Sequence, residues 1–166
     1  LVVGLGNPGK QYVGNRHNVG FMLADRLCVE SSLPTPREKF SGGFTKGVAF
    51  GGDVAVLTPR TFMNLSGESV QPAAAFLKVE PKDVGQCVIG NVIHTEARDM
   101  YISRLCAVNG GLPHDTGAFT VNRLCGSGMQ AIVTAAQYIL LGDTDAAVAG
   151  GAESMSRAAY ASLTQR

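Results

Sequence analysis

The chain has 166 residues, of which 45% are hydrophobic and 16% are charged, and its formal net charge is +1. This composition excludes intrinsic disorder, and the near-zero charge gives no electrostatic footprint for nucleic acid. No apolar run is expected to reach the ~18 residues of a membrane span. The four cysteines have neither disulfide nor zinc-site spacing, so a cytoplasmic location without membrane contact is expected.

The first half of the chain alternates apolar runs with loops rich in glycine, asparagine and proline. In chain order we expect a strand at residues 1–5, a helix at 19–30, strands at 43–50 and 53–57, and a helix from Ser66 to Lys78. Gly51 and Gly52 supply the turn between the second and third strands. Pro72 is expected to kink the second helix, because it lacks a backbone N–H group.

The second half continues the alternation of strands and helices. We expect strands at 87–93, 119–121 and 145–150, and helices at 99–108 and 125–141. Gly142 should stop the last helix. Strands that alternate with helices predict an α/β fold, here an incomplete layered one with a mixed sheet in its first part.

The composition changes near residue 84. Residues 1–84 hold all five lysines and six of the seven prolines, and their net charge is +2; residues 85–166 hold no lysine and carry −1. Such a change is typical of a domain boundary. We therefore predict two parts, 1–84 and 85–166.

Residues 4–9 match the GxGxxG pattern of dinucleotide sites. That site needs a helix to begin at the third glycine, with its N-terminus facing the pyrophosphate. Because a long loop containing Pro8 follows instead, we reject this interpretation.

His17 lies between a polar loop and a helix, next to Asn18. A histidine there can take a proton from water that attacks an ester, although a helix cap and a loop hydrogen bond would also explain the pair. The segment TFMNLSG at 61–67 adds an aromatic side chain and an amide, Phe62 and Asn64, on a loop before a helix. Binding residues are often found on such loops.

Residues 1–84 resemble the bacterial peptidyl-tRNA hydrolase family through the motifs VGLGNPG at 3–9, RHNVGF at 16–21 and TFMNLSGESV at 61–70. The resemblance implies that His17 is the general base that hydrolyses the ester between peptide and tRNA. It also implies that Asn7, Tyr12, Phe62 and Asn64 bind the substrate. The family's next strand leads to an aspartate that orients the histidine. Here the matching segment, residues 85–90, contains no carboxylate.

Cys125 lies where a short strand is expected to turn into an apolar helix. Backbone N–H groups and the helix dipole at that position favour a thiolate, and the small residues that follow leave room for a substrate. A small buried cysteine under the helix is the alternative. We assign the other three, Cys28, Cys87 and Cys106, to buried packing.

Residues 85–166 resemble the thiolase family through GNVI at 90–93, RDMY at 98–101, NRLCGSG at 122–128 and GGAESMS at 150–156. The resemblance implies a thiolase-like half-domain in which Cys125 accepts an acyl group from acyl-coenzyme A. The activating histidine and the second, acid–base cysteine of thiolases have no counterpart here, and no cofactor is implied.

His94, Glu96, Asp99, His114 and Asp115 are the alternative for a metal site, but their spacing fits no standard set, so we expect no metal.

The sequence thus indicates a hybrid of two unrelated families, each without essential partners. Three hypotheses remain: a residual hydrolase or acyltransferase, a non-catalytic α/β binding module for tRNA acyl ends or acyl groups, and a joined chain with no function of its own. The missing partners favour the third hypothesis and then the second. The oligomeric state does not follow from the sequence.

Overall fold

A computed structural model describes residues 1–160, which form two units, Leu1–Val79 and the part from Glu80 onward. The structure thus groups residues 80–84 with the second unit. They form a short 3₁₀ turn, Pro81–Asp83, that leads directly into the first strand of that unit.

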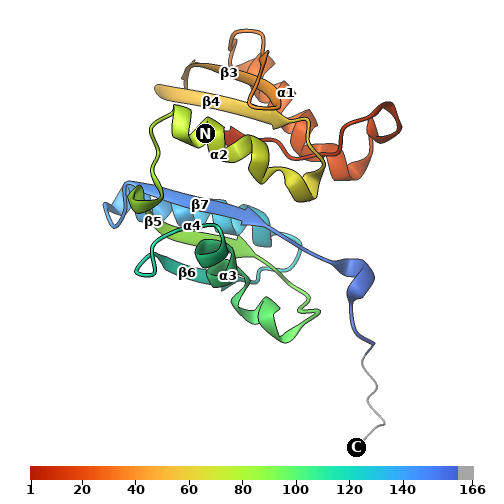
Figure 1. The fold of residues 1–166 in the computed structure, drawn as a ribbon, viewed down its shortest axis with the longest axis vertical. Helices are drawn as coiled ribbons and strands as arrows, with labels where there is room; N and C mark the ends of the chain where they lie inside the picture. The colour runs from red at the N-terminus through yellow and green to blue at the C-terminus, as the bar shows by residue number, and fades with distance from the viewer. Residues whose placement is uncertain (161–166) are drawn as a thin grey trace, which may run out of the picture. The chain divides into compact units, whose positions relative to one another are not determined.

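The first unit contains a mixed four-stranded sheet of order β1-β4-β3-β2. Its elements are β1 (Val2–Val3), α1 (Val19–Glu30), β2 (Arg37–Lys39), β3 (Gly42–Ala49), β4 (Gly52–Pro59) and α2 (Gly67–Phe76). β1 is parallel to β4, whereas β3 is antiparallel to both β4 and β2. Figure 1 shows these elements in the red-to-yellow part of the chain.

Alternating side chains of β4 build a core on each face of this sheet. Ala55 and Leu57 pack with Ala73 of α2, whereas Val56 packs with Ala24 of α1. A strand presents successive side chains to opposite faces, so the apolar run of β4 requires a helix on both sides. The first unit is therefore a three-layer α/β/α structure.

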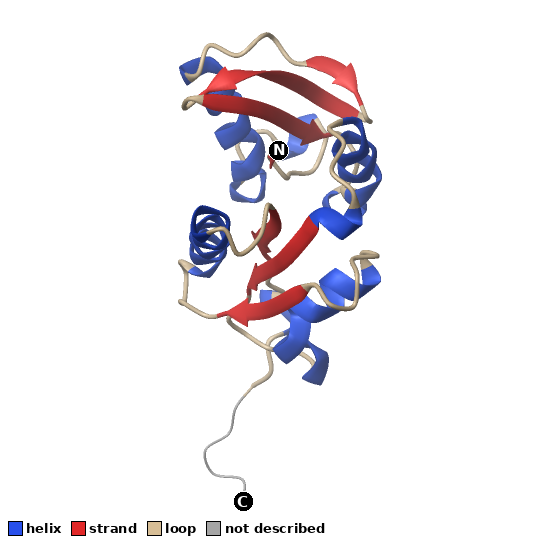
Figure 2. Ribbon diagram, turned by 90° about the vertical axis from the view of Figure 1, so that its left-hand side faces the viewer, coloured by secondary structure: helices blue, strands red, loops and turns tan. Residues whose placement is uncertain are grey.

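The second unit contains a parallel three-stranded sheet of order β6-β5-β7. Its elements are β5 (Val84–Gly90), α3 (Ile102–Asn109), β6 (Gly117–Val121), α4 (Ser127–Leu141) and β7 (Ala146–Gly151). Cys87 and Ile89 of β5 pack toward α3, and Val88 packs toward α4. The two helices consequently lie on opposite faces of the sheet (Figure 2).

The predicted α/β class is confirmed in both units, and α1 has the predicted bounds. Several predicted bounds were wrong. The first strand is only Val2–Val3, β5 spans Val84–Gly90 rather than residues 87–93, and α4 begins at Ser127 rather than Cys125. β4 and β6 extend beyond the predicted 53–57 and 119–121, and β2 was not predicted. The Asn91 N–H still donates to the Val121 carbonyl of β6 at 3.1 Å, but the N–H groups of Val92 and Ile93 donate to the Glu153 side chain instead of a neighbouring strand, so β5 does not continue.

Two further predicted helices differ at their ends. Residues 97–101 form a 3₁₀ turn before α3, and α2 ends at Phe76, short of Lys78, whose φ is +60°. Pro72 lies inside α2 without ending it. Gly142 stops α4 in the left-handed conformation, as predicted.

The segment Leu124–Leu141 reaches 18 residues and is apolar enough to cross a membrane by length and composition alone. The expectation that no run approaches this length was therefore wrong. In the structure most of this segment is α4, and its buried residues Ala131 and Ala135 pack on Val88 of β5. α4 is thus one layer of the second unit.

Replacement of Leu57 by alanine tests the core of the first unit. Leu57 is 0% exposed, so Leu57→Ala should lower the free energy of unfolding of this unit by about 2–5 kcal/mol. Val48→Ala on the adjacent strand is the control, because Val48 is exposed and should change the value by less than about 0.5 kcal/mol. Hydrogen exchange of the β3 and β4 amides measures both. Equal protection in the two variants would contradict the core assignment.

Candidate functional site

The residues predicted to act on peptidyl-tRNA all lie in the first unit. Tyr12 ends a 3₁₀ turn and is half-buried, and His17 lies in a second such turn just before α1. Phe62 and Asn64 are exposed at the turn before α2. Cys125 belongs to the second unit.

Asn7 joins the glycine-rich loop to the turn that carries Phe62 and Asn64. The Asn7 side-chain oxygen accepts a hydrogen bond from the backbone N–H of Met63 at 3.0 Å. Met63 lies between Phe62 and Asn64 in sequence. The structure therefore brings two of the three predicted motifs into direct contact.

Asn18 fixes the position of Asn7, a role that the sequence analysis missed. The Asn18 side-chain oxygen accepts from the backbone N–H of Asn7 at 2.8 Å, and its amide nitrogen donates to the Asn7 carbonyl at 2.9 Å. Asn18 is only 5% exposed, and it makes no side-chain cap at the start of α1. A cap was the obvious role for an asparagine at this position, so no local signal indicated the contact.

The His17 side chain is exposed, and within residues 1–160 its imidazole forms no hydrogen bond. Its backbone N–H donates to the Asn15 side chain at 2.9 Å, which fixes the main chain but not the ring. A general base needs a partner on the other ring nitrogen to fix its tautomer and to stabilise its cation. No such partner is present in the described part of the first unit.

Cys125 lies on a tight turn between β6 and α4. The residue before it, Leu124, has φ of +48°, a left-handed conformation that is uncommon for a side chain of this size. The Leu124 N–H donates to the Asn122 side chain at 3.1 Å. The Ser127 hydroxyl accepts from the Arg123 N–H at 2.8 Å and donates to the Leu124 carbonyl at 2.7 Å. These bonds hold the turn, and strain of this kind is often found at functional sites.

Three glycines allow α4 to approach the carboxyl ends of β5 and β7. A Cβ atom on Gly90 would lie 2.5 Å from the Ser127 carbonyl carbon and 2.6 Å from the Gly128 nitrogen. A Cβ atom on Gly151 would lie 3.2 Å from the Gly128 Cα. A Cβ atom on Gly90 would therefore force α4 to move, and one on Gly151 would fit only tightly. The close contact places the Cys125 turn at the carboxyl edge of the parallel sheet.

The exposed Cys125 side chain borders a cavity of about 540 Å³ at this edge. Its lining consists of Gly90, Val92, Ile93, Leu124, Cys125, Ser127, Gly128, Gly151, Ala152, Glu153 and Met155. The described lining includes neither a histidine nor a second cysteine. Its one ionisable group besides the thiol is the Glu153 carboxylate, which accepts hydrogen bonds from the backbone N–H groups of Val92 at 3.0 Å and Ile93 at 2.9 Å.

The other three cysteines differ in their exposure to solvent. Cys28 and Cys87 are buried, as predicted, but Cys106 is exposed, so its assignment to buried packing was wrong. Burial raises the pKa of the Cys87 thiol to about 11. Partial desolvation also raises the pKa of Cys106, and burial followed by the charge of Asp25 raises that of Cys28.

Two of the acidic residues considered for a metal site, Glu96 and Asp99, have other partners. Asp99 accepts from the backbone N–H groups of Thr95 and Glu96, and Glu96 pairs with Arg98 and Arg157. These bonds lower the pKa of Asp99, chiefly through Thr95, and that of Glu96, chiefly through Arg98. Within residues 1–160, no group of three or more His, Cys, Asp or Glu side chains could hold a metal ion.

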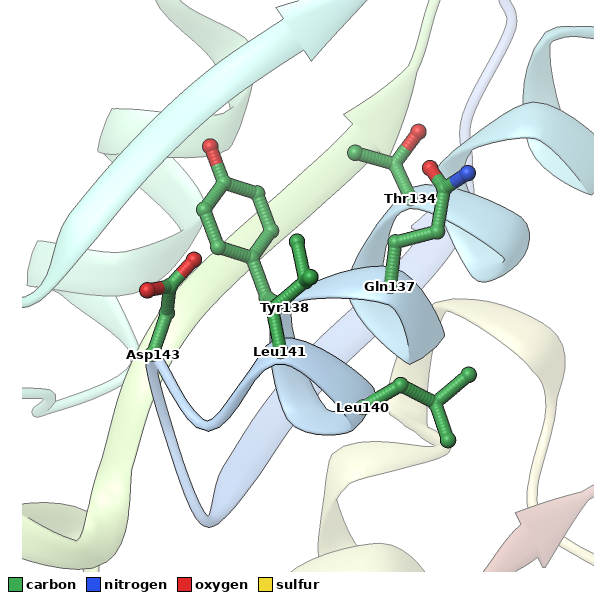
Figure 3. Close-up of a pocket in the computed structure, with 6 residues that line it drawn as sticks. All are labelled: Thr134, Gln137, Tyr138, Leu140, Leu141 and Asp143. Atoms are coloured by element: carbon green, nitrogen blue, oxygen red, sulfur yellow. The ribbon is translucent and has the colours of Figure 1, made fainter.

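A second hollow, of about 670 Å³, lies along the last turns of α4. It is lined by Thr134, Gln137, Tyr138, Leu140, Leu141 and Asp143 (Figure 3). The Leu140 side chain points away from the Tyr138 ring. The described lining contains no nucleophile paired with a base, so this hollow has no chemistry of the kind found at Cys125.

The reactivity of the four thiols tests this description. With limiting iodoacetamide at pH 8, Cys125 should be alkylated first and Cys106 second. Cys87 should react at least about a hundredfold more slowly than Cys125, because burial blocks access and its raised pKa leaves few thiolates. Peptide mapping by mass spectrometry measures each site, and the chain unfolded in guanidinium is the control. Equal alkylation rates at all four cysteines in the folded chain would refute the assignment of Cys125 and Cys106 as exposed and of Cys28 and Cys87 as buried.

Comparison with known proteins finds two families along the chain. The model of the family described as Peptidyl-tRNA hydrolase matches residues 1–97, and that of Beta-ketoacyl synthase, N-terminal domain, matches residues 106–166. The peptidyl-tRNA hydrolase of Methylocella silvestris is 51% identical over 84 residues, which cover 51% of this chain and 43% of that protein. The beta-ketothiolase BktB of Cupriavidus necator is 56% identical over 120 residues, 72% of this chain and 30% of that protein.

Two solved structures have related folds. A peptidyl-tRNA hydrolase in complex with N-propanol matches with a TM-score of 0.51 over 85% of this chain and 88% of that one, and at 22% identity this likeness concerns the fold alone. The Acat5 thiolase of Ascaris suum, in complex with coenzyme A, matches with a TM-score of 0.51 and 27% identity over 58% of this chain and 25% of that one.

The chain spans less than half the length of the two curated relatives named above. The family matches support the hybrid character predicted from the motifs, while the boundary at residue 84 stays a prediction. Through residues 1–97 the chain belongs to the peptidyl-tRNA hydrolase family, and behind them it carries a segment similar to thiolases and β-ketoacyl synthases.

Proposed function

We propose that the chain performs one half-reaction, the acceptance of an acyl group by Cys125 from an acyl-coenzyme A thioester, and completes neither parent reaction. The supporting observation is the exposed Cys125 thiol at a largely apolar cavity, on a turn held by Ser127 and Asn122. A cavity of about 540 Å³ is of the size that small-molecule sites have.

In this half-reaction the Cys125 thiolate attacks the carbonyl carbon of the thioester. The bond between that carbon and the coenzyme A sulfur then breaks, which leaves an S-acyl cysteine and a coenzyme A thiolate. The cysteine proton is released to water, and the departing thiolate takes a proton from water. Ser127 does not compete as a nucleophile, because its hydroxyl is engaged in the turn and the residue is 4% exposed.

The reaction stops at this stage because carbon–carbon bond formation needs a base. A second acyl thioester must lose a proton from the carbon next to its carbonyl before it can attack the acyl cysteine. The carboxylate of Glu153 already accepts hydrogen bonds on both oxygens. The described lining of the cavity offers no other base.

For the first unit we propose recognition of the acyl end of peptidyl-tRNA without hydrolysis. Asn7, held by Asn18 and bonded to Met63, keeps the loop next to the turn of Phe62 and Asn64. Amide groups of this kind suit a peptide, because each offers donors and an acceptor. His17 would be the base for water, but no carboxylate in its own unit orients it. This contact network supports the alternative function, a non-catalytic binding module.

Acylation of Cys125 can be followed directly. Incubation of the chain with acetyl-coenzyme A should add one acetyl group, seen in the intact mass, and Cys125→Ser should remain unmodified. No acetoacetyl-coenzyme A should form, because no base activates the second substrate. Acetylation of Cys125→Ser to the same extent would refute the role of Cys125, and formation of acetoacetyl-coenzyme A would refute the incompleteness of the site.

Peptidyl-tRNA hydrolysis should stay at background. Loss of the acid that orients a catalytic histidine lowers the rate by about 10⁴ in serine proteases, and a comparable loss is expected here. The assay is cleavage of diacetyl-lysyl-tRNA by the chain and by His17→Ala, which should give equal rates. A clear rate that disappears in His17→Ala would overturn this part of the proposal.

A further inference from the structure

The Glu153 carboxylate links the segment after β7 to the loop after β5. One of its oxygens accepts from the Ile93 N–H at 2.9 Å and from the Asn91 side-chain amide at 3.3 Å, and the other accepts from the Val92 N–H at 3.0 Å. All three donors lie about 60 residues earlier in the chain. The Glu153 side chain is exposed, and its carboxylate is the anchor of this loop, because hydrogen bonds to an ionised acceptor are stronger than neutral ones.

The anchored loop forms one wall of the Cys125 cavity. Val92 and Ile93 both line it, together with Leu124 and Cys125 of the turn that carries the thiol. The same loop is tied to that turn, because the Asn122 side chain donates to the Val92 carbonyl at 3.5 Å and accepts from the Leu124 N–H. Asn91, 3% exposed, completes the attachment by donating to the Ala152 carbonyl at 2.8 Å.

Glu153 itself is poorly placed for proton transfer. Both of its oxygens are held by backbone donors, which leaves the carboxylate little freedom to move toward a substrate. The apolar residues at the cavity, Val92, Ile93 and Met155, offer no polar partner to a substrate group. The geometry therefore suits a structural task at the cavity better than a chemical one.

We propose that Glu153 is a positioning residue, which holds the Val92–Ile93 wall so that the Cys125 cavity accepts an apolar chain on the group that the thiol takes up. The inference deepens the proposed function and rests on it for the identity of the natural acyl donor. Without the anchor, the two N–H groups lose their acceptor and the wall loses its fixed position. The preference of the cavity for a longer apolar group should then fall. The thiol should keep its intrinsic reactivity, because Ser127 and Asn122 hold its turn.

Two maleimides that differ only in chain length provide the test. The Cys125 thiol adds across the double bond of N-ethylmaleimide and of N-hexylmaleimide in the same way. The ratio of the two rates therefore reports how the cavity accepts the alkyl group and does not depend on the reactivity of the thiol. Burial of the longer chain should favour N-hexylmaleimide about tenfold in the wild type. In Glu153→Gln the ratio should fall toward one, because the amide group meets an N–H donor where the carboxylate accepted one.

Glu96→Gln is the matched control. It removes the same charge and releases Arg157 in the same C-terminal segment, but Glu96 does not line the Cys125 cavity. Peptide mapping assigns the adducts to Cys125 rather than to the exposed Cys106. If Glu153→Gln does not fold, Glu153→Asp keeps the charge on a side chain one methylene shorter, and the same direction is expected.

A ratio that falls in Glu153→Gln and stays high in Glu96→Gln supports the inference. The inference is overturned if the wild type shows no preference for N-hexylmaleimide or if a Glu153 variant keeps that preference. It is also overturned if the rate ratio falls equally in Glu96→Gln. This readout needs no thioester. A chain that fails to take acetyl from acetyl-coenzyme A therefore refutes the proposed function, while the maleimide ratios still decide the role of Glu153.

Discussion

The contact between the start of α4 and the carboxyl ends of β5 and β7 determines the geometry of the second unit. Gly90, Gly128 and Gly151 meet backbone to backbone, at separations that leave no room for a Cβ atom on Gly90. Because the helix approaches this closely, the turn before it reaches the edge of the sheet, where the loop after β5 also ends. That approach places the Cys125 turn and the first residues of α4 at the cavity. A side chain on Gly90 would displace α4 and with it the wall that Ser127 and Gly128 form.

The sequence predicted those features that depend on local spacing. α1 was predicted with its observed bounds because apolar residues recur at helical intervals between a polar loop and a chain reversal. β5 was extended to residue 93 because Val92 and Ile93 are as apolar as the strand before them. Their N–H groups are instead bound by Glu153, some 60 residues away, and no local pattern encodes that partner. The Asn18–Asn7 contact was missed for a similar reason, since an asparagine before a helix suggests a cap.

The two sites share one arrangement, in which neutral polar side chains fix the main chain around a reactive group. In the first unit Asn18 and Asn7 hold the loops beside His17, and in the second Ser127 and Asn122 hold the turn of Cys125. These contacts join residues within one motif or between motifs of the same unit. The ionisable partner that would complete each reaction is not among them. Motifs that persist locally can therefore rebuild the scaffold of a site without its acid–base chemistry.

The packing of the helices in the second unit shows the same separation between the residues that hold the site and those that would carry out its chemistry. Its fully buried helix residues are small, namely Ser103, Ala107 and Ala131, and they remove little apolar area from water, whereas Leu140 of α4 is 84% exposed. Apolar burial by these helix residues therefore contributes little to the stability of the second unit, although α4 is an apolar helix. The Cys125 turn does not depend on that contribution, because glycine contacts and short hydrogen bonds define it. The turn is therefore held by close backbone packing and by neutral hydrogen bonds, and the charge-assisted bonds of Glu153 hold the loop beside it.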